Sequence, residues 1–275
     1  MVSTTVAGVS VAGAGSEPQD QSNAMAARER SERMGKDDAS KVARDLWADM
    51  VPVLPAFYFG SVEHYRLLAK HPRVIIDLGE HYERQSYRTR TRIVGPNGVQ
   101  DLTVQIARRS GEKMPMHTVG LNYVETWPQQ HVHAIRSAYG NTPWFIHYID
   151  EIEAVVLKKY ERLVDLDLAT MRLGLKWLGL GTEVLLSEEY VVPSLLSDVL
   201  SRSMSSNGRG HETSDNEQGI DLRTTLHPKR PLPPELTAVP AYPQIFADRH
   251  GFAPRMSVID LVMNAGPEAR RSLLA

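Results

Sequence analysis

The 275-residue chain contains no cysteine, which excludes disulfide bonds, thiolate nucleophiles and cysteine-ligated metals. It also lacks any apolar run close to the ~18 residues that a membrane-spanning helix requires. Residues 1–15 have neither a basic start nor a strong apolar centre, so they do not resemble a secretory signal. We therefore expect a cytoplasmic protein without a membrane span.

The chain is also poor in net charge and in aromatic side chains. The net charge is −2 and 7% of residues are aromatic, with no basic stripe between them, which disfavours general nucleic-acid binding. No glycine-rich phosphate loop, Gly-x-Ser-x-Gly elbow or His-Glu-x-x-His motif occurs. These absences disfavour dinucleotide-dependent enzymes, P-loop NTPases, serine hydrolases and zinc proteases. We see no metal motif, and the sequence requires no cofactor.

Composition divides the chain into a tail, a domain and a loop. Residues 1–40 are rich in Ala, Gly, Ser and charge without periodic apolar positions, which predicts a disordered tail. The similar composition of 203–219 predicts a mobile loop. The remaining sequence within 41–275 is long enough to bury a core, and we expect one α/β domain there.

The domain begins with the pattern of a strand, a helix and a strand. The apolar run 51–56 predicts the first strand, and the spacing of apolar residues over 62–70 suits one face of a helix. Pro72 ends that helix, and 73–78 predicts a second, buried strand. Because the connections are short, these elements predict a parallel crossover.

Turn and capping signals predict the elements that follow. Asn97-Gly98 between two apolar runs is typical of a hairpin. Thr126 followed by Pro128 and Gln129 has the pattern of a capping box, and Asp165 or Asp167 is predicted to cap a later helix. We expect a mixed sheet with an early parallel crossover and several packed helices. The predicted ranges are 92–94 and 102–106 for the hairpin strands, and 126–139, 142–163, 168–178 and 256–263 for the helices.

The residues most indicative of a site follow the second predicted strand. Segment 79–93 holds four arginines, two glutamates, a histidine and two tyrosines. Ligands of open α/β sheets bind at the carboxyl ends of strands. Glu80 or His81 is therefore a candidate general base, with Asp77 orienting it or holding a ligand. The alternative is a polar loop in which Asp77 caps a turn.

Three of these arginines recur at two-residue intervals. In an extended segment, Arg88, Arg90 and Arg92 would point the same way at spacings of about 6–7 Å. Their charges repel at that distance, so they need carboxylates or an anionic ligand such as phosphate. Asp77, Glu80 and Glu83 are the nearby carboxylates. The alternative to an anion site is a solvated or internally paired strand.

Histidines supply further candidates. His131 falls on the buried stripe of the helix predicted from Thr126, where it is either a general base or a hydrogen-bonded core residue. His133 falls on the solvated face of the same helix. Two residues is the wrong spacing for a metal pair on a helix. His64, after the turn at Gly60, is a weaker candidate near the end of the first strand.

Several ordered blocks of the chain resemble the WbqC-like protein family. The resemblance covers roughly residues 50–200 and 220–274, and the chain departs from the family pattern at Thr89, where Asn is frequent, and at Gly60-Ser61, where Pro-Pro is frequent. These departures suggest an altered activity or another acceptor. The blocks that carry the resemblance are 54–59, 80–82, 85–93, 95–98, 127–131, 137–139, 143–145, 159–165, 257–261 and 266–268.

The resemblance implies a role in biosynthesis. Members of this family occur in bacterial O-antigen and other polysaccharide gene clusters, and some are proposed glycine transferases. We therefore expect acyl or aminoacyl transfer to an amine on a polysaccharide or small-molecule precursor. The donor would be an activated acyl or aminoacyl group, delivered by a carrier protein or an aminoacyl-tRNA. The anionic portion of a substrate such as a nucleotide-linked sugar would bind the arginines.

These expectations assign roles to twelve residues. The catalytic candidates are Asp77, Glu80, His81 and His131, and the substrate-binding candidates are Tyr58, His64, Tyr82, Arg84, Tyr87, Arg88, Arg90 and Arg92. Two other functions stay open. One is a nucleotide-dependent activating enzyme of the nucleotidyltransferase type, favoured by the strand, turn and helix around Gly60. The other is a non-catalytic partner or carrier-binding protein.

Overall fold

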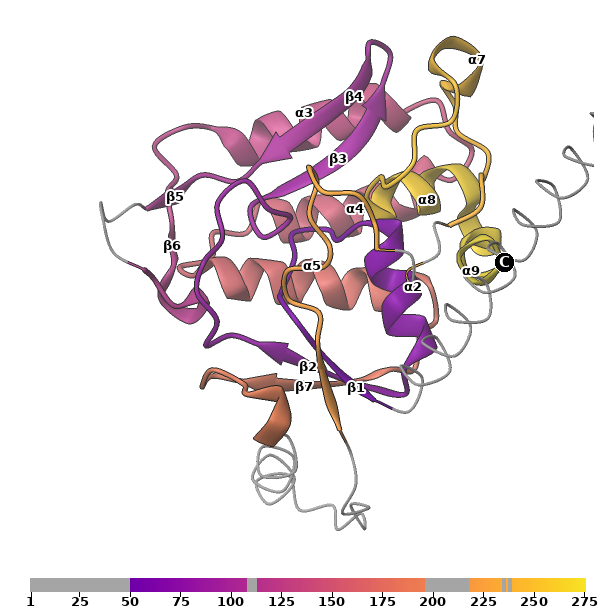
Figure 1. The fold of residues 1–275 in the computed structure, drawn as a ribbon. Coiled ribbons are helices and arrows are strands. Elements are labelled where there is room, and N and C mark those ends of the chain that lie inside the picture. Colours follow the sequence, from indigo (N-terminus) through magenta and orange to yellow (C-terminus); the bar gives the residue numbers. More distant parts are fainter. Residues whose placement is uncertain (1–49, 108–112, 196–217, 234–235, 237–238) are drawn as a thin grey trace, which may run out of the picture. The chain divides into compact units, whose positions relative to one another are not determined.

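A computed structural model describes residues 50–107, 113–195, 218–233, 236 and 239–275 (Figure 1). The predicted tail at 1–40 lies outside these residues, and so does the predicted loop at 203–219 except for its last two positions. Gly219 of that loop belongs to a strand.

The centre of the fold is a four-stranded sheet in the order β7-β2-β1-β8, and all three strand pairs are parallel. Helix α2 connects the two central strands, so the predicted parallel crossover is confirmed. Strand β7, which the sequence did not predict, extends the sheet on one edge. The bounds are β1 Val51–Leu54, α2 Val62–Lys70, β2 Arg73–Asp77, β7 Glu183–Ser187 and β8 Gly219–Asp221.

Antiparallel pairing is confined to two small sheets. Strands β3 (Arg90–Gly95) and β4 (Gly98–Thr103) form the predicted hairpin, with Gly95 opposite Gly98. Gly98 has φ of 103°, a conformation in which glycine has no steric penalty. Strands β5 (Ile106–Ala107) and β6 (Gly120–Leu121) form the second pair.

Three longer helices follow, as predicted, but their starts differ from the prediction. Thr126 makes no side-chain capping bond, so the predicted capping box is wrong. Asp165 and Asp167 lie inside the third helix, which begins at Leu163, so neither caps it. Leu163 therefore belongs to this helix and not to the one before it. The bounds are α3 Trp127–Tyr139, α4 Phe145–Val156, α5 Leu163–Trp177, α7 Ala247–His250, α8 Val258–Ala265 and α9 Ala269–Leu274.

The main core lies between the sheet and helices α2, α4 and α5, which Figure 1 shows on one side of the sheet. The opposite side of β1 and β2 carries a smaller apolar cluster of Val51, Val53, Ile75 and Val191. Apolar residues therefore cover both faces of the central strands, as expected of a parallel sheet. No helix within the described ranges is both long enough and apolar enough to cross a bilayer.

Candidate functional site

The candidate site begins where β1 ends. Residues 55–61 are all buried and lead into α2. Within them Phe59 has φ of 41°, a conformation that residues other than glycine adopt rarely and mostly at constrained positions. Its amide donates to Thr170 Oγ1 at 3.0 Å, and its carbonyl accepts from Thr91 and Ser257 at 2.7 and 3.1 Å. Contacts from α5, β3 and the start of α8 thus hold this turn.

The Phe57 ring joins three predicted site residues. Its centroid lies 4.9 Å from that of the His64 ring and 5.7 Å from that of Tyr87. The guanidinium carbon of Arg88 lies 6.0 Å from the same centroid. All four side chains are buried. The structure therefore brings together residues from the segment after β1, from α2 and from the segment before β3.

Carboxylates of the protein itself neutralise Arg88. Its Nε and Nη2 donate to the two oxygens of Glu80 at 2.8 and 2.6 Å, and Nη1 donates to Glu83 at 3.2 Å. Because both Glu80 oxygens face the guanidinium, this carboxylate holds Arg88 in place and is a poor candidate for a general base. The sequence left open whether these arginines pair with carboxylates of the protein or bind an anionic ligand, and for Arg88 the structure shows pairing with carboxylates.

A second buried ion pair ties the carboxyl ends of β2 and β8 together. Arg223 donates to Asp77 and to Asp221, and its carbonyl accepts from Arg88 Nη2 at 3.2 Å. Asp77 also accepts from the amide of Gly79 at 2.9 Å, so it caps a turn as the alternative predicted. Sequence reasoning missed Arg223, since 146 residues separate it from Asp77.

The other two arginines of the predicted cluster lie elsewhere. Arg90 and Arg92 both bind Asp101 on the facing hairpin strand, at 3.2 and 3.1 Å. They share one face of β3, whereas Arg88 precedes the strand and is buried beside Phe57. The expectation that all three arginines point the same way is therefore wrong.

Three more predicted residues lie outside the buried cluster or at its margin. His81 and Arg84 are exposed, and His81 forms a strand-like bridge with Pro115. Tyr82 is partly buried, and its hydroxyl lies 3.3 Å from Thr89 Oγ1. The predicted general base role of His81 therefore has no geometric support.

Tyr58 and His131 form a buried pair. The Tyr58 hydroxyl lies 3.0 Å from His131 Nδ1. Burial lowers the pKa of His131 to about 4, so the ring is neutral at pH 7 and its Nδ1 can accept a hydrogen bond. Burial and the nearby charge of Asp167 raise the pKa of Tyr58 well above its usual value, so the phenol keeps its proton. The hydroxyl therefore donates to the imidazole.

Asp167 on α5 is the most unusual carboxyl group in this region. It is 0% exposed, and no described group donates a hydrogen bond to either oxygen. Burial raises the pKa of Asp167 well above its usual range, while the charge of Arg88 lowers it and that of Glu80 raises it. One turn later, Thr170 binds the carbonyl of Phe57. Asp167 thus lies beside segment 57–59 and the Arg88–Glu80 pair.

Other buried polar atoms without partners in the described chain gather nearby. They include both ring nitrogens of His64, the Tyr87 hydroxyl and one oxygen of Glu63. Burial lowers the pKa of His64 to about 3, so the ring is neutral. Gly60 makes room for this ring, because a Cβ there would lie 2.3 Å from His64 Nδ1. Buried polar atoms normally have partners, so this concentration of exceptions marks the candidate site.

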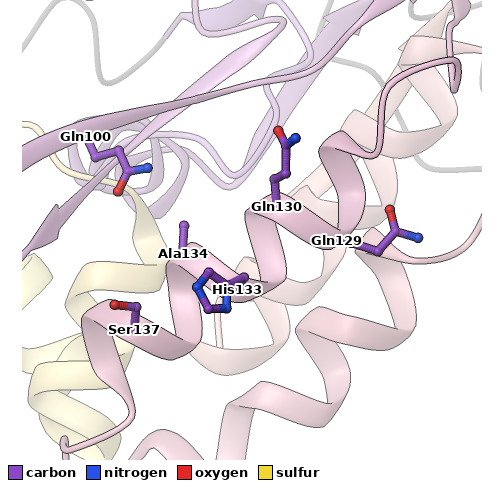
Figure 2. Close-up of a pocket in the computed structure, with 6 residues that line it drawn as sticks. All are labelled: Gln100, Gln129, Gln130, His133, Ala134 and Ser137. Atoms are coloured by element: carbon purple, nitrogen blue, oxygen red, sulfur yellow. The ribbon is translucent and has the colours of Figure 1, made fainter.

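A separate, shallow groove lies on the outer surface between β4 and α3 (Figure 2). Its volume is about 440 Å³, and its lining combines amides with an imidazole, a methyl group and a hydroxyl. His133 lines it, whereas His131 on the same helix is buried against Tyr58, as the helical pattern predicted. In the described ranges, no three His, Asp or Glu side chains are grouped to hold a metal. The lining residues are Gln100, Gln129, Gln130, His133, Ala134 and Ser137.

Comparison with known families gives a clear assignment. A model of the WbqC-like protein family matches residues 58–272. The chain belongs to this family. The matched range contains the candidate site residues from Tyr58 to Arg223 but not Phe57, and it confirms the resemblance inferred from the sequence. Searches of the curated proteins and of the solved structures found no match.

Proposed function

We propose that the protein transfers an acyl or aminoacyl group to an amine on a polysaccharide or small-molecule precursor. The observation that carries this proposal is the buried Tyr58–His131 pair beside the unpartnered Asp167. Amine acylation needs a group that accepts a proton from the attacking nitrogen inside a water-poor site. Membership of the WbqC-like family supports the same reaction class.

The Tyr58–His131 pair would remove the proton of the amine. As the nitrogen attacks the carbonyl carbon, its proton moves to the Tyr58 oxygen and the Tyr58 proton moves to His131 Nδ1. The resulting imidazolium then returns a proton through Tyr58 to the leaving group when the tetrahedral intermediate collapses. His131 replaces Glu80 as the preferred base, because Arg88 occupies both Glu80 oxygens.

Arg88 would stabilise negative charge on the carbonyl oxygen. Glu80 and Glu83 fix its guanidinium in one orientation, so no reorganisation is needed during the reaction. Arg88 itself is 1% exposed, so water screens its charge weakly. This role differs from the anchoring of a substrate phosphate, which needs guanidinium groups without internal carboxylate partners.

The test is a transfer assay with the full chain. Acyl thioesters, aminoacyl carrier proteins and aminoacyl-tRNAs are each combined with amino-sugar nucleotides, and products are identified by mass spectrometry. Tyr58→Phe and His131→Gln should lower the transfer rate by about 100-fold or more. His133→Gln, on the exposed face of the same helix, is the matched control and should leave it unchanged.

Other outcomes separate the rival functions. Transfer that survives both Tyr58→Phe and His131→Gln would remove the proposed mechanism. Binding of ATP or CTP with magnesium, measured by calorimetry, without amine acylation would favour a nucleotide-activating enzyme. A stable complex with a carrier protein, but no product from any donor, would favour a non-catalytic partner.

A further inference from the structure

Acidic groups outnumber basic groups in the candidate site. Five carboxyl groups and three guanidinium groups gather at the carboxyl ends of β2 and β8 and around Arg88. Four of the carboxyl groups contact an arginine, and Asp167 is the fifth. The groups are Asp77, Glu80, Glu83, Asp167 and Asp221, with Arg88, Arg223 and Arg230. The four carboxyl groups that contact an arginine already outnumber the three guanidinium groups, so the site offers an anionic ligand no net positive charge.

The side chain of Asp167 has no contact with solvent. It is fully buried inside α5, and the hydroxyl of Thr170 binds the carbonyls of Asp167 and Phe57 and fixes the adjoining turn. A buried carboxyl group without hydrogen bonds is costly, and the cost disappears when a charged donor supplies both hydrogen bonds and a countercharge. An ammonium group has three N–H donors and a positive charge, so it meets both needs.

We infer that Asp167 anchors a primary-ammonium subsite that receives the amine-bearing group of a substrate. This inference rests on the proposed transfer reaction and names the substrate chemistry that the site selects. The ammonium belongs either to the α-amino group of an aminoacyl donor or to the amine of the acceptor, and in the second case it returns one proton to Asp167 before its nitrogen attacks. In both cases it lies near segment 57–59, because Thr170, one turn along α5 from Asp167, binds the Phe57 carbonyl and the Phe59 amide.

Binding should depend on pH. Burial raises the pKa of Asp167 and so favours its protonated form, whereas a bound ammonium favours the ionised form. The charged and titratable groups that act on this carboxyl are Arg88, Glu80 and Tyr58. Arg88 favours the ionised form and Glu80 opposes it. Affinity for the amine should therefore rise with pH as long as the ligand stays charged.

Calorimetry with matched probes tests the inference on the full chain. Glycinamide is compared with glycolamide, and glucosamine with glucose, because each pair differs in the replacement of an amine by a hydroxyl. The wild type should bind the amine about 10- to 100-fold more tightly in at least one pair. Discrimination in the first pair assigns the subsite to the donor, and discrimination in the second assigns it to the acceptor.

Two variants localise the effect. Asp167→Asn keeps the shape of the side chain and should abolish the preference for the amine. Asp165→Asn is the matched control, because Asp165 lies on the same helix and pairs with the exposed Arg162. Its preference should equal that of the wild type. Circular dichroism establishes that both variants fold, and the comparison of probes on the wild type needs no variant.

Two results would overturn the inference: no preference for the amine in either pair, or a preference that Asp167→Asn retains. The transfer assay is scored separately. Ammonium binding without transfer would contradict the proposed function alone, and transfer without ammonium binding would contradict this inference alone.

Discussion

Two buried aspartates, Asp167 on α5 and Asp260 on α8, occupy opposite situations in the same core. Both are 0% exposed, and burial raises the pKa of each. Asp260 accepts hydrogen bonds from Tyr139 and Tyr242 at 2.7 and 2.6 Å, and also from Gln244 and Asn264. Asp167 accepts none from the described residues.

The difference separates a structural carboxyl group from a functional one. Asp260 ties α3, α8 and the segment around 242–244 together, and its hydrogen bonds offset part of the cost of burial. Asp167 bears a comparable cost of burial, and no hydrogen bond from the described residues offsets it. A fold tolerates a buried carboxyl group without hydrogen bonds where a ligand supplies them. An unsatisfied group at one position therefore indicates a function at that position.

Replacement of Asp260 should have the largest effect on stability. Asp260→Ala leaves the buried hydroxyl groups of Tyr139 and Tyr242 without their acceptor and removes one of the acceptors of two amides, so the free energy of unfolding should fall by about 4–5 kcal/mol. Urea denaturation at pH 7 measures this change. A loss below about 1 kcal/mol would remove the contrast between the two aspartates.

The second-largest effect on stability should distinguish the buried Arg88 from the partly exposed Arg90. Arg88→Met leaves the buried Glu80 carboxylate without its countercharge and should lower the free energy of unfolding by about 3–4 kcal/mol. Arg90→Met removes a partly exposed contact with Asp101 and should cost about 1 kcal/mol or less. The same urea experiment compares them, and equal losses would show that burial of the Arg88 pair has no energetic consequence.

The pH dependence of stability sharpens the picture of the Tyr58–His131 pair. The pKa of His131 is about 4 in the folded chain against 6.5 ordinarily, so between these values the unfolded state binds more protons and acid destabilises the fold. His131→Gln should flatten the wild-type dependence by up to about 1.4 kcal/mol per pH unit in this window. His133→Gln serves as the control, and an unchanged slope in His131→Gln would mean that His131 is not held neutral by burial.

Much of the fold follows from local sequence signals. Pro72 and the apolar spacing over 62–70 predicted the crossover, and Asn97-Gly98 predicted the hairpin, because each depends on neighbours in the chain. Strand β7 was missed although its apolar run Val184-Leu185-Leu186 is as long as Val74-Ile75-Ile76 of β2, because leucine indicates a strand less strongly than the β-branched isoleucine. The start of α5 was misplaced because aspartates favour both caps and first turns.

The candidate site was predictable only in part. Segment 79–93 did contribute Glu80, Tyr87 and Arg88 to the buried cluster, as its position after β2 indicated. Whether Arg88 pairs with carboxylates of the protein depends on side-chain directions that spacing alone does not fix. Asp167 was assigned to a helix cap, and its lack of a partner is a property of the packed core that no local pattern encodes.

The most direct test of the central claim is a paired measurement on Asp167→Asn. If Asp167 awaits a ligand, its free energy of unfolding at pH 7 should stay within about 1 kcal/mol of the wild-type value, because no hydrogen bond is lost. The transfer rate should fall by about 100-fold or more in the same preparation, because the amine-bearing substrate loses its anchor. A variant that loses several kcal/mol of stability yet transfers at the wild-type rate would make Asp167 a structural residue and contradict the account.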